Sequence, residues 1–406
     1  MKRKSIALLL ALMMCLALLS ACGGNGTTET SEPPSSGSTA QPTEDGKEEQ
    51  PTQEPGQGEP TETEPAETEQ PTETEPTETE PTETPEPAPS EETSGTFTYT
   101  YEGGVVTISG NGILDKAAMD ECGATNVLKM NTAQVVLEPG VTKIGDFIFE
   151  SCLITSITIP EGVTEIGAYA FFHCDLTSVT IPEGVTKIGE GAFQSCSILR
   201  SVTIPDSVTE IGESAFSSCS SLTSVTIPEG VTVIGESTFY MCQNLASVVI
   251  PSSVTEIGES AFFSCRSLTS VTIPEGVTKI GELAFYECHS LTSVTIPEGV
   301  TEIGNGTFAY CSLTNVVISN SVTKIGASAF FMCRNLANVT IPEGVAEIGE
   351  SAFDQCSSLT SVTIPKSVTK INDRAFNQCA LTSVTIPNPS AVVAANAFDN
   401  GVTVNQ

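Results

Sequence analysis

From about residue 130 onward, apolar and polar positions follow one pattern that recurs every 22 or 23 residues. One copy reads SLTSVTIPEGVTKIGELAFYECHS and runs from Ser267 to Ser290. The stretch VTxIG and its close variants begin at eleven valines, and a cysteine recurs eleven times at the same spacing. Self-similarity at this period predicts a stacked solenoid of about eleven coils rather than a globular core.

Within a copy, the stretch LTSVTIP alternates apolar and polar residues. Leu291, Val294 and Ile296 point to one side, and Ser293 and Thr295 point to the other. This period of two predicts one strand per coil, with strands of successive coils paired in parallel.

The rest of each copy brings the chain back inward at VTxIG and then reads Gly-Glu-x-Ala-Phe. We expect a short helical turn there, with the glutamate near its N-terminal end. About eight apolar residues per coil face inward, and only stacking buries them. The predicted fold is an α/β repeat solenoid, with a parallel sheet on one face and short helical turns on the other.

The flanks of the repeats predict further units. Around Glu102, the alternating stretch GTFTYTYEGGVVTISGNG indicates a β-hairpin, and Ile113 to Asn131 is ambiguous and partly helical in pattern. We therefore expect an N-terminal cap over residues 96–131, the solenoid over 132–387 and a C-terminal cap over 388–406, because the ends of a repeat array must be shielded.

The first 22 residues have the pattern of an export signal. Basic residues precede an apolar stretch from Ile6 to Leu19, which is too short for a comfortable membrane span. The stretch LSAC, ending at Cys22, resembles the bacterial lipoprotein signal, which implies a signal peptide over 1–21 and a diacylglycerol on the Cys22 thiol. Ordinary signal cleavage followed by secretion is the alternative.

Residues 22–95 have the composition of a tether. Between 23 and 95 there are 20 Asp or Glu against the single Lys47, with almost no aliphatic or aromatic residue. Such a segment cannot bury enough apolar surface to order itself, so we expect a disordered Pro/Thr/Glu-rich linker behind a lipid anchor. This organisation predicts a lipid-anchored protein exposed on the cell envelope, and the Gly-rich residues after Cys22 favour a Gram-positive one.

The net charge argues against one class of partner, and the alternation of charged residues between copies indicates how the coils stack. The chain carries a formal net charge of -34, which argues against nucleic acid as a partner. At the variable place in VTxIG the signs alternate between neighbouring copies in eight of ten pairs, and opposite charges on neighbouring strands are favourable. The residues there are Lys143, Glu165, Lys187, Glu210, Val233, Glu256, Lys279, Glu302, Lys324, Glu347 and Lys370.

The repeated pattern LxxVxIPxxVxxIGxxAFxxC resembles the bacterial BspA-like leucine-rich repeat family over about residues 130 to 390. The resemblance implies a curved or superhelical array on a cell surface, with adhesion to host proteins or other cells as its role. We expect an extracellular protein or glycan as partner, and a membrane contact only through the lipid. A structural spacer without a specific ligand is the alternative.

The regular cysteines are not arranged as a metal site, because each coil contributes one cysteine and metal ligands converge from short spacings. We interpret them as a column of buried thiols that act as small hydrophobic residues, while the export route keeps disulfides open. His173 and His289 lie five coils apart, roughly 24 Å at the strand spacing. The sequence therefore predicts no metal, no cofactor and no catalytic set.

Five acids in successive copies, Glu190, Glu213, Glu236, Glu259 and Glu282, form a possible column of carboxylates. Oxygen ligands at such a spacing are of the kind that Ca²⁺ prefers. The alternative is that each glutamate stands in solvent beside its own turn.

The positions that vary most flank the cysteine in the central copies, where aromatic residues and arginines gather. A rigid scaffold with a varied edge is a common arrangement for binding, whereas the outward Ser/Thr positions of the strands predict a solvated face. The candidate partner-binding residues are Tyr240, Phe263, Arg266, Tyr286, His289, Tyr310, Phe331 and Arg334. The aromatic rings could instead be extra core between coils, but the two arginines fit that interpretation less well.

Overall fold

The computed structural model describes residues 95–131 and 133–406. The predicted signal peptide, the Cys22 lipidation and the tether up to residue 94 lie outside these residues. Within the described part, no helix is long and apolar enough to cross a membrane.

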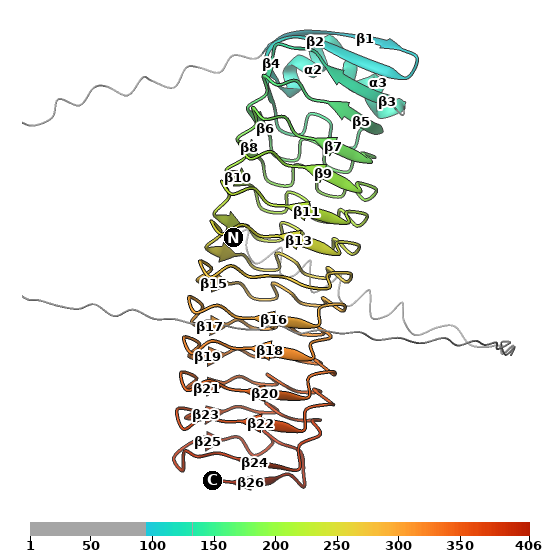
Figure 1. Cartoon of the computed structure of the whole chain (residues 1–406). Coiled ribbons are helices and arrows are strands. Elements are labelled where there is room, and N and C mark those ends of the chain that lie inside the picture. Colours follow the sequence, from blue (N-terminus) through green and yellow to red (C-terminus); the bar gives the residue numbers. More distant parts are fainter. Residues whose placement is uncertain (1–94, 132) are drawn as a thin grey trace, which may run out of the picture. The chain divides into compact units, whose positions relative to one another are not determined.

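The repeats form a β-solenoid, as the period predicts, and each coil contributes to two columns of parallel strands (Figure 1). The first column comes from the alternating LTSVTIP stretches, whose Ser, Thr and Asn side chains face outward. In the coil from Ser267 to Ser290, residues 270–273 do not form a regular strand. The strands are β3 (Ala133–Leu137), β5 (Ile154–Thr158), β7 (Ser178–Thr180), β9 (Ser201–Thr203), β11 (Ser224–Thr226), β13 (Ser247–Val249), β16 (Ser293–Thr295), β18 (Asn315–Val317), β20 (Asn338–Thr340), β22 (Ser361–Thr363), β24 (Ser383–Thr385) and β26 (Thr403–Asn405).

The second column was not predicted, because VTxIG is too short to show a strand period. Its short strands pair in parallel, so that each variable residue lies opposite its counterpart in the next coil. They are β4 (Val141–Ile144), β6 (Glu165–Ile166), β8 (Lys187–Ile188), β10 (Glu210–Ile211), β12 (Val233–Ile234), β14 (Glu256–Ile257), β15 (Lys279–Ile280), β17 (Glu302–Ile303), β19 (Lys324–Ile325), β21 (Glu347–Ile348), β23 (Lys370–Ile371) and β25 (Val392–Val393).

A hairpin and two short helices cover the first coil. β1 (Thr96–Glu102) pairs antiparallel with β2 (Val105–Leu114), which confirms the predicted hairpin. β2 also pairs in parallel with both β3 and β4, so this one long strand covers the first strand of both columns. α2 (Lys116–Cys122) and α3 (Ala124–Met130) form the partly helical stretch.

The expected helical turns after VTxIG are wrong: these stretches form hydrogen-bonded turns, and the helices of the described residues lie before the repeats. Alternate amides bond in different directions. The Phe193 N–H donates to Ala215 O of the next coil, whereas the Gln194 N–H donates to Gly191 O of its own turn. Left-handed residues such as Ser214 and Ser218 recur four apart, which no α-helix accommodates. The turns thus add a third set of hydrogen bonds between coils.

The core is a continuous column between the strands and turns. In one coil, all eight inward residues from Leu176 to Cys196 are buried, as predicted. Twelve phenylalanines from Phe149 to Phe398 stack along the column, and the ring centroids of neighbouring phenylalanines lie between 5.1 and 5.7 Å apart. Residues 388–406 add a twelfth, degenerate coil, in which Phe398 stacks on Phe376 and β26 pairs with β24.

Candidate binding edge

The candidate residues of the central coils lie on one side of the solenoid, directly after the core phenylalanines. We call the turn residues from Tyr240 to Arg334 that follow each core phenylalanine the binding edge. Tyr240, Phe263 and Tyr286 are half-buried and stack in sequence, with centroids 4.8 and 4.7 Å apart. The rings therefore pack between coils, as the alternative interpretation has it, and they still present atoms to solvent. Their part in partner binding stays a prediction.

The stacked order changes at Tyr310. Ala309 occupies the place that Tyr286 and Phe331 hold in the neighbouring coils, and Tyr310 stands one residue later. The Tyr310 ring meets Tyr286 at 61° and Phe331 at 74°, with centroids 5.2 and 5.3 Å apart. Burial, with further contributions from Tyr310 and Glu287, raises the pKa of Tyr286, so this phenol stays protonated.

A shallow cavity of about 480 Å³ opens at this irregularity, and we call it the notch. Leu283, Tyr286, Tyr310 and Phe331 form apolar walls around a small residue, Ala309. The other lining residues are Glu282, Asn305, Gly306, Ala327 and Ser328.

Sequence reasoning found three of the notch residues, Tyr286, Tyr310 and Phe331, but missed the two small ones that create it. Gly306 has a φ of 61°, and a Cβ there would lie 2.6 Å from Leu283 Cδ2. The available signal was the copy FAYCS, in which alanine replaces an aromatic residue. Large aromatic residues and arginines mark an anchor in a sequence, whereas a small residue such as Ala309 does not.

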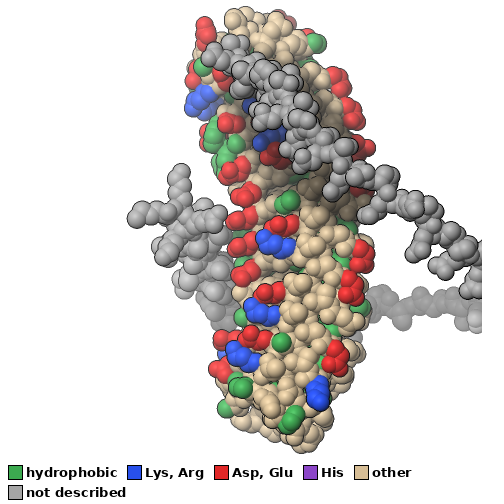
Figure 2. All heavy atoms as spheres, turned by 90° about the vertical axis from the view of Figure 1, so that its left-hand side faces the viewer, with side chains coloured by type: hydrophobic (Ala, Val, Ile, Leu, Met, Phe, Trp, Pro, Cys, Tyr) green, Lys and Arg blue, Asp and Glu red, His purple; other side chains and the backbone are tan. Residues whose placement is uncertain are grey.

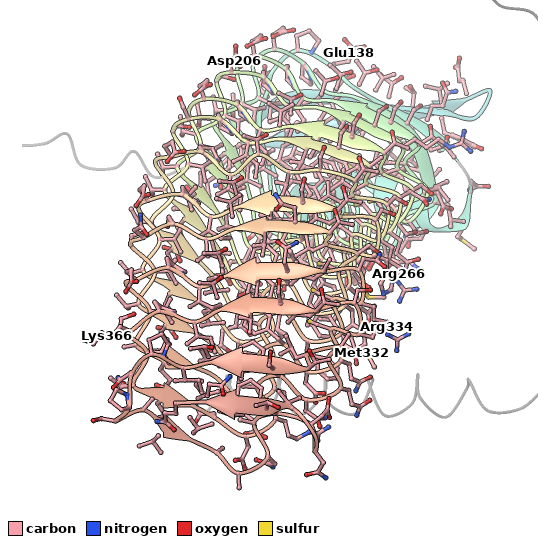
Figure 3. All side chains as sticks on the ribbon, turned by 60° about the horizontal axis from the view of Figure 1, so that its bottom comes forward. Glu138, Asp206, Arg266, Met332, Arg334 and Lys366 are labelled. Carbon is pink, nitrogen blue, oxygen red and sulfur yellow. The ribbon has the colours of Figure 1, made fainter. Side chains whose placement is uncertain are left out.

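Three basic candidates project from the cysteine side of the binding edge, and Figure 3 shows Arg266 and Arg334 on the same side of the coils. Arg266 is not free: its Nη2 donates to Glu287 Oε2 at 2.9 Å, and Ser264 Oγ donates to the same oxygen at 2.8 Å. His289 and Arg334 are exposed, and Arg334 lies beside Met332. The coil with Ser312 separates these two residues, so they do not form one cluster.

The repeated cysteines line the core beneath this edge. From Cys152 to Cys356 they are buried, and each Sγ from Cys174 onward donates to the carbonyl of a core phenylalanine in the preceding coil, as Cys242 does to Phe216 O at 3.2 Å. Burial raises the pKa of the Cys242 thiol to about 12. The predicted burial of the column is confirmed, and its thiols are held protonated.

The five glutamates proposed as a calcium column are exposed. Within the described residues, no group of three or more His, Cys, Asp or Glu side chains could hold a metal ion. Their carboxylates have other neighbours: Glu190 accepts from the Tyr169 hydroxyl, and Glu282 accepts from Asn305 Nδ2 at 2.8 Å. The solvated interpretation therefore holds, although beside hydrogen-bonded turns rather than helical ones.

The alternating charges of the second strand column form ion pairs between coils, and we call this set the charge ladder. Lys324 pairs with Glu302 at 2.5 Å, and Lys370 pairs with Glu347 at 2.8 Å. Figure 2 shows this face, where blue and red side chains stand beside one another and further acidic side chains follow both margins. Hydrogen bonds from Lys370 and Asn372 lower the pKa of Glu347. The ladder supports stacking, as predicted.

Comparison with known proteins agrees with this geometry. The family model for the BspA-type leucine-rich repeat region matches in six copies, among them residues 128–245, 164–292 and 278–405. The chain belongs to the BspA-type leucine-rich repeat family. The predicted family and the repeat-solenoid fold are thus confirmed, with hydrogen-bonded turns in place of the expected helical ones.

Several solved structures resemble this BspA-type solenoid. A leucine-rich repeat protein from Bacteroides ovatus has a TM-score of 0.51 and 26% identity, covering 75% of this chain and 98% of its own. A leucine-rich cell surface protein from Faecalibacterium prausnitzii has a TM-score of 0.47 and 31% identity over 77% and 94% of the two chains. The pneumococcal vaccine antigen PcpA is 16% identical, with a TM-score of 0.50, over 76% and 91%. No curated protein is significantly similar.

Proposed function

We propose that this protein is a cell-surface adhesin, which binds an extracellular protein or glycan of a host or of other bacteria through the binding edge. The observation that carries the proposal is the set of half-buried aromatic rings from Tyr240 to Phe331, which contact one another from coil to coil beside the exposed His289 and Arg334. Tyrosine and arginine are typical anchors of interfaces. A rigid scaffold holds them in place at little entropic cost.

The strand face supports binding less well. Most of its outward side chains in the first column, such as Ser293, Thr295 and Asn338, are short, polar and exposed. Val249 and Val317 are exposed valines among them, and the strands of this column present no aromatic or arginine anchor, so a partner there would gain less apolar area than at the rings of the edge.

We further propose that a lipid on Cys22 anchors the chain to a Gram-positive envelope and that residues 23–95 act as the spacer. The related Faecalibacterium protein is described as a cell surface protein. Anchoring of this kind would leave the coils free to meet a partner outside the cell, and we infer binding rather than catalysis.

Attachment measurements test the proposal. We would replace Arg266, Tyr286, His289 and Arg334 together in the full chain and measure attachment to immobilised mammalian extracellular matrix and to neighbouring bacteria. We expect attachment to fall at least tenfold, because the substitutions remove the anchors of one surface.

The control places alanine at Ser293, Thr295, Asn315 and Asn338, which lie on the strand face of the same region. Both variants must keep the unfolding midpoint of the wild type within a few degrees. Unchanged attachment of the edge variant would favour a spacer without a specific ligand.

A further inference from the structure

We propose that the notch binds one large apolar side chain of an extracellular protein, at a place where that residue stands next to a lysine or arginine. This inference deepens the proposed adhesive function and rests on it. The partner side chain would enter the gap that Ala309 leaves in the aromatic run rather than pack around a protruding residue.

The notch is preformed by hydrogen bonds between three successive coils. The Leu283 N–H donates to Asn305 O at 3.0 Å, and the Gly306 N–H donates to Ala327 O at 2.9 Å. On the cysteine side, the Tyr310 N–H donates to Phe331 O at 2.8 Å. Because the backbone fixes all three coils, a partner side chain would enter without the cost of ordering the walls.

The walls favour an apolar occupant of side-chain size. The cavity of about 480 Å³ lies at the lower end of the range for ligand sites, and rings or aliphatic carbons line most of it. Ala309 is itself buried, so the space above it is where an aromatic ring stands in the coils of Tyr286 and Phe331. A ring or branched side chain from a partner would restore the stacking that Ala309 interrupts.

The rim carries a fixed negative charge. Glu282 is the only charged residue that lines the notch. Asn305 bridges two coils there, because its Oδ1 accepts from the Ala327 N–H and its Nδ2 donates to Glu282 Oε1, each at 2.8 Å. The carboxylate is therefore held beside the opening, where a cation next to the entering side chain would meet it.

Charge also selects between possible occupants. Residues 96–406 contain 30 Asp or Glu against 12 Lys or Arg, and residues 23–95 contain 20 against one. A second copy of this chain, or its own N-terminal segment, would bring mainly negative charge to Glu282. A basic segment of another protein is complementary in charge, and it gains on-rate as well as affinity. A cation near the tyrosine rings adds a favourable contact.

The test uses a fluorescein-labelled peptide with the core Lys-Phe-Lys and measures its fluorescence anisotropy on titration with the full chain. Matched peptides carry Glu-Phe-Glu or Lys-Ala-Lys. We expect saturable binding of the first peptide, at least tenfold weaker binding of the other two, and several-fold weakening at 0.5 M salt. Equal binding of the Glu-Phe-Glu peptide would overturn the proposal.

Two substitutions fill the notch in ways that the chain already uses. Ala309→Phe places a ring where Tyr286 and Phe331 have one, and Gly306→Leu repeats Leu283, which has a positive φ of 57°. Each should weaken peptide binding at least tenfold. The control is Gln194→Phe, which places a phenylalanine at the position equivalent to Ala309 in a distant coil and should leave peptide binding unchanged. Glu282→Gln should weaken it several-fold.

The proposal fails if either notch-filling variant folds and binds the peptide as tightly as the wild type. Attachment to matrix and bacteria, measured in parallel, separates this failure from that of the adhesive function. If replacing Arg334 and His289 lowers attachment but Ala309→Phe does not, the proposed adhesive function stands and the proposal for the notch fails.

Discussion

At the residue scale, the glycine of VTxIG decides how closely two coils approach. A Cβ added at Gly212 would lie 2.4 Å from the Glu190 backbone nitrogen, whereas one at Gly235 would meet nothing nearer than 3.5 Å. We expect Gly212→Ala to lower the free energy of unfolding by ~2 kcal/mol, because backbone atoms must move apart. Gly235→Ala is the matched control and should change it by less than about 0.5 kcal/mol. Urea denaturation measures both, and equal losses would contradict this account of the spacing.

Single residues also show what a sequence pattern can and cannot reveal. The buried set from Leu176 to Cys196 could be predicted, because its members recur in most or all of the eleven copies and repetition marks shared packing. Ala309 and Gly306 were missed although the copy FAYCS departs from the pattern, since their effect is to leave space and depends on Leu283 and Tyr310 beside them. Arg266 was predicted to be an anchor, but its pairing with Glu287 requires the register between coils.

At the scale of the element, the charge ladder offers a reversible test of stacking. Lys324 lies opposite Glu302 and Glu347, so Lys324→Glu places three like charges in register. Like charges directly opposite cost up to ~1 kcal/mol each, so we expect a loss of about 1 to 2 kcal/mol at low salt that shrinks at 1 M salt. Val233→Lys restores the alternation beside Glu256 and should raise stability slightly. A loss that salt leaves unchanged would mean that packing, not charge, is responsible.

The elements differed in how far they could be predicted. The hairpin of β1 and β2 and the first strand column follow from alternation of period two, which survives in short strands. The turns were misjudged because Gly-Glu-x-Ala-Phe has the composition of a helix start, while its amides are used between coils, as between Phe193 and Ala215. The two-residue strands of the second column are too short to carry a period of their own.

At the scale of the whole molecule, we propose that a repeated scaffold binds its partner through the varied edge between Tyr240 and Arg334. Uniform coils supply rigidity through two strand columns, the hydrogen-bonded turns and the phenylalanine stack. Function is then expected where the repeat is least regular, between Tyr240 and Arg334. The family and the fold were predictable from the repeat, whereas the repeat by itself does not indicate the partner.

Photo-crosslinking from two positions of one coil tests this claim most directly. A benzophenone amino acid replaces Tyr310 on the binding edge or Thr314, an exposed residue at the start of the strand face, in otherwise wild-type full chains. On irradiation with solubilised extracellular matrix and with neighbouring bacteria, we expect saturable adducts from position 310 that excess unlabelled protein abolishes, and none from position 314. Adducts that form from position 314 alone, or equally from both positions, would contradict the account.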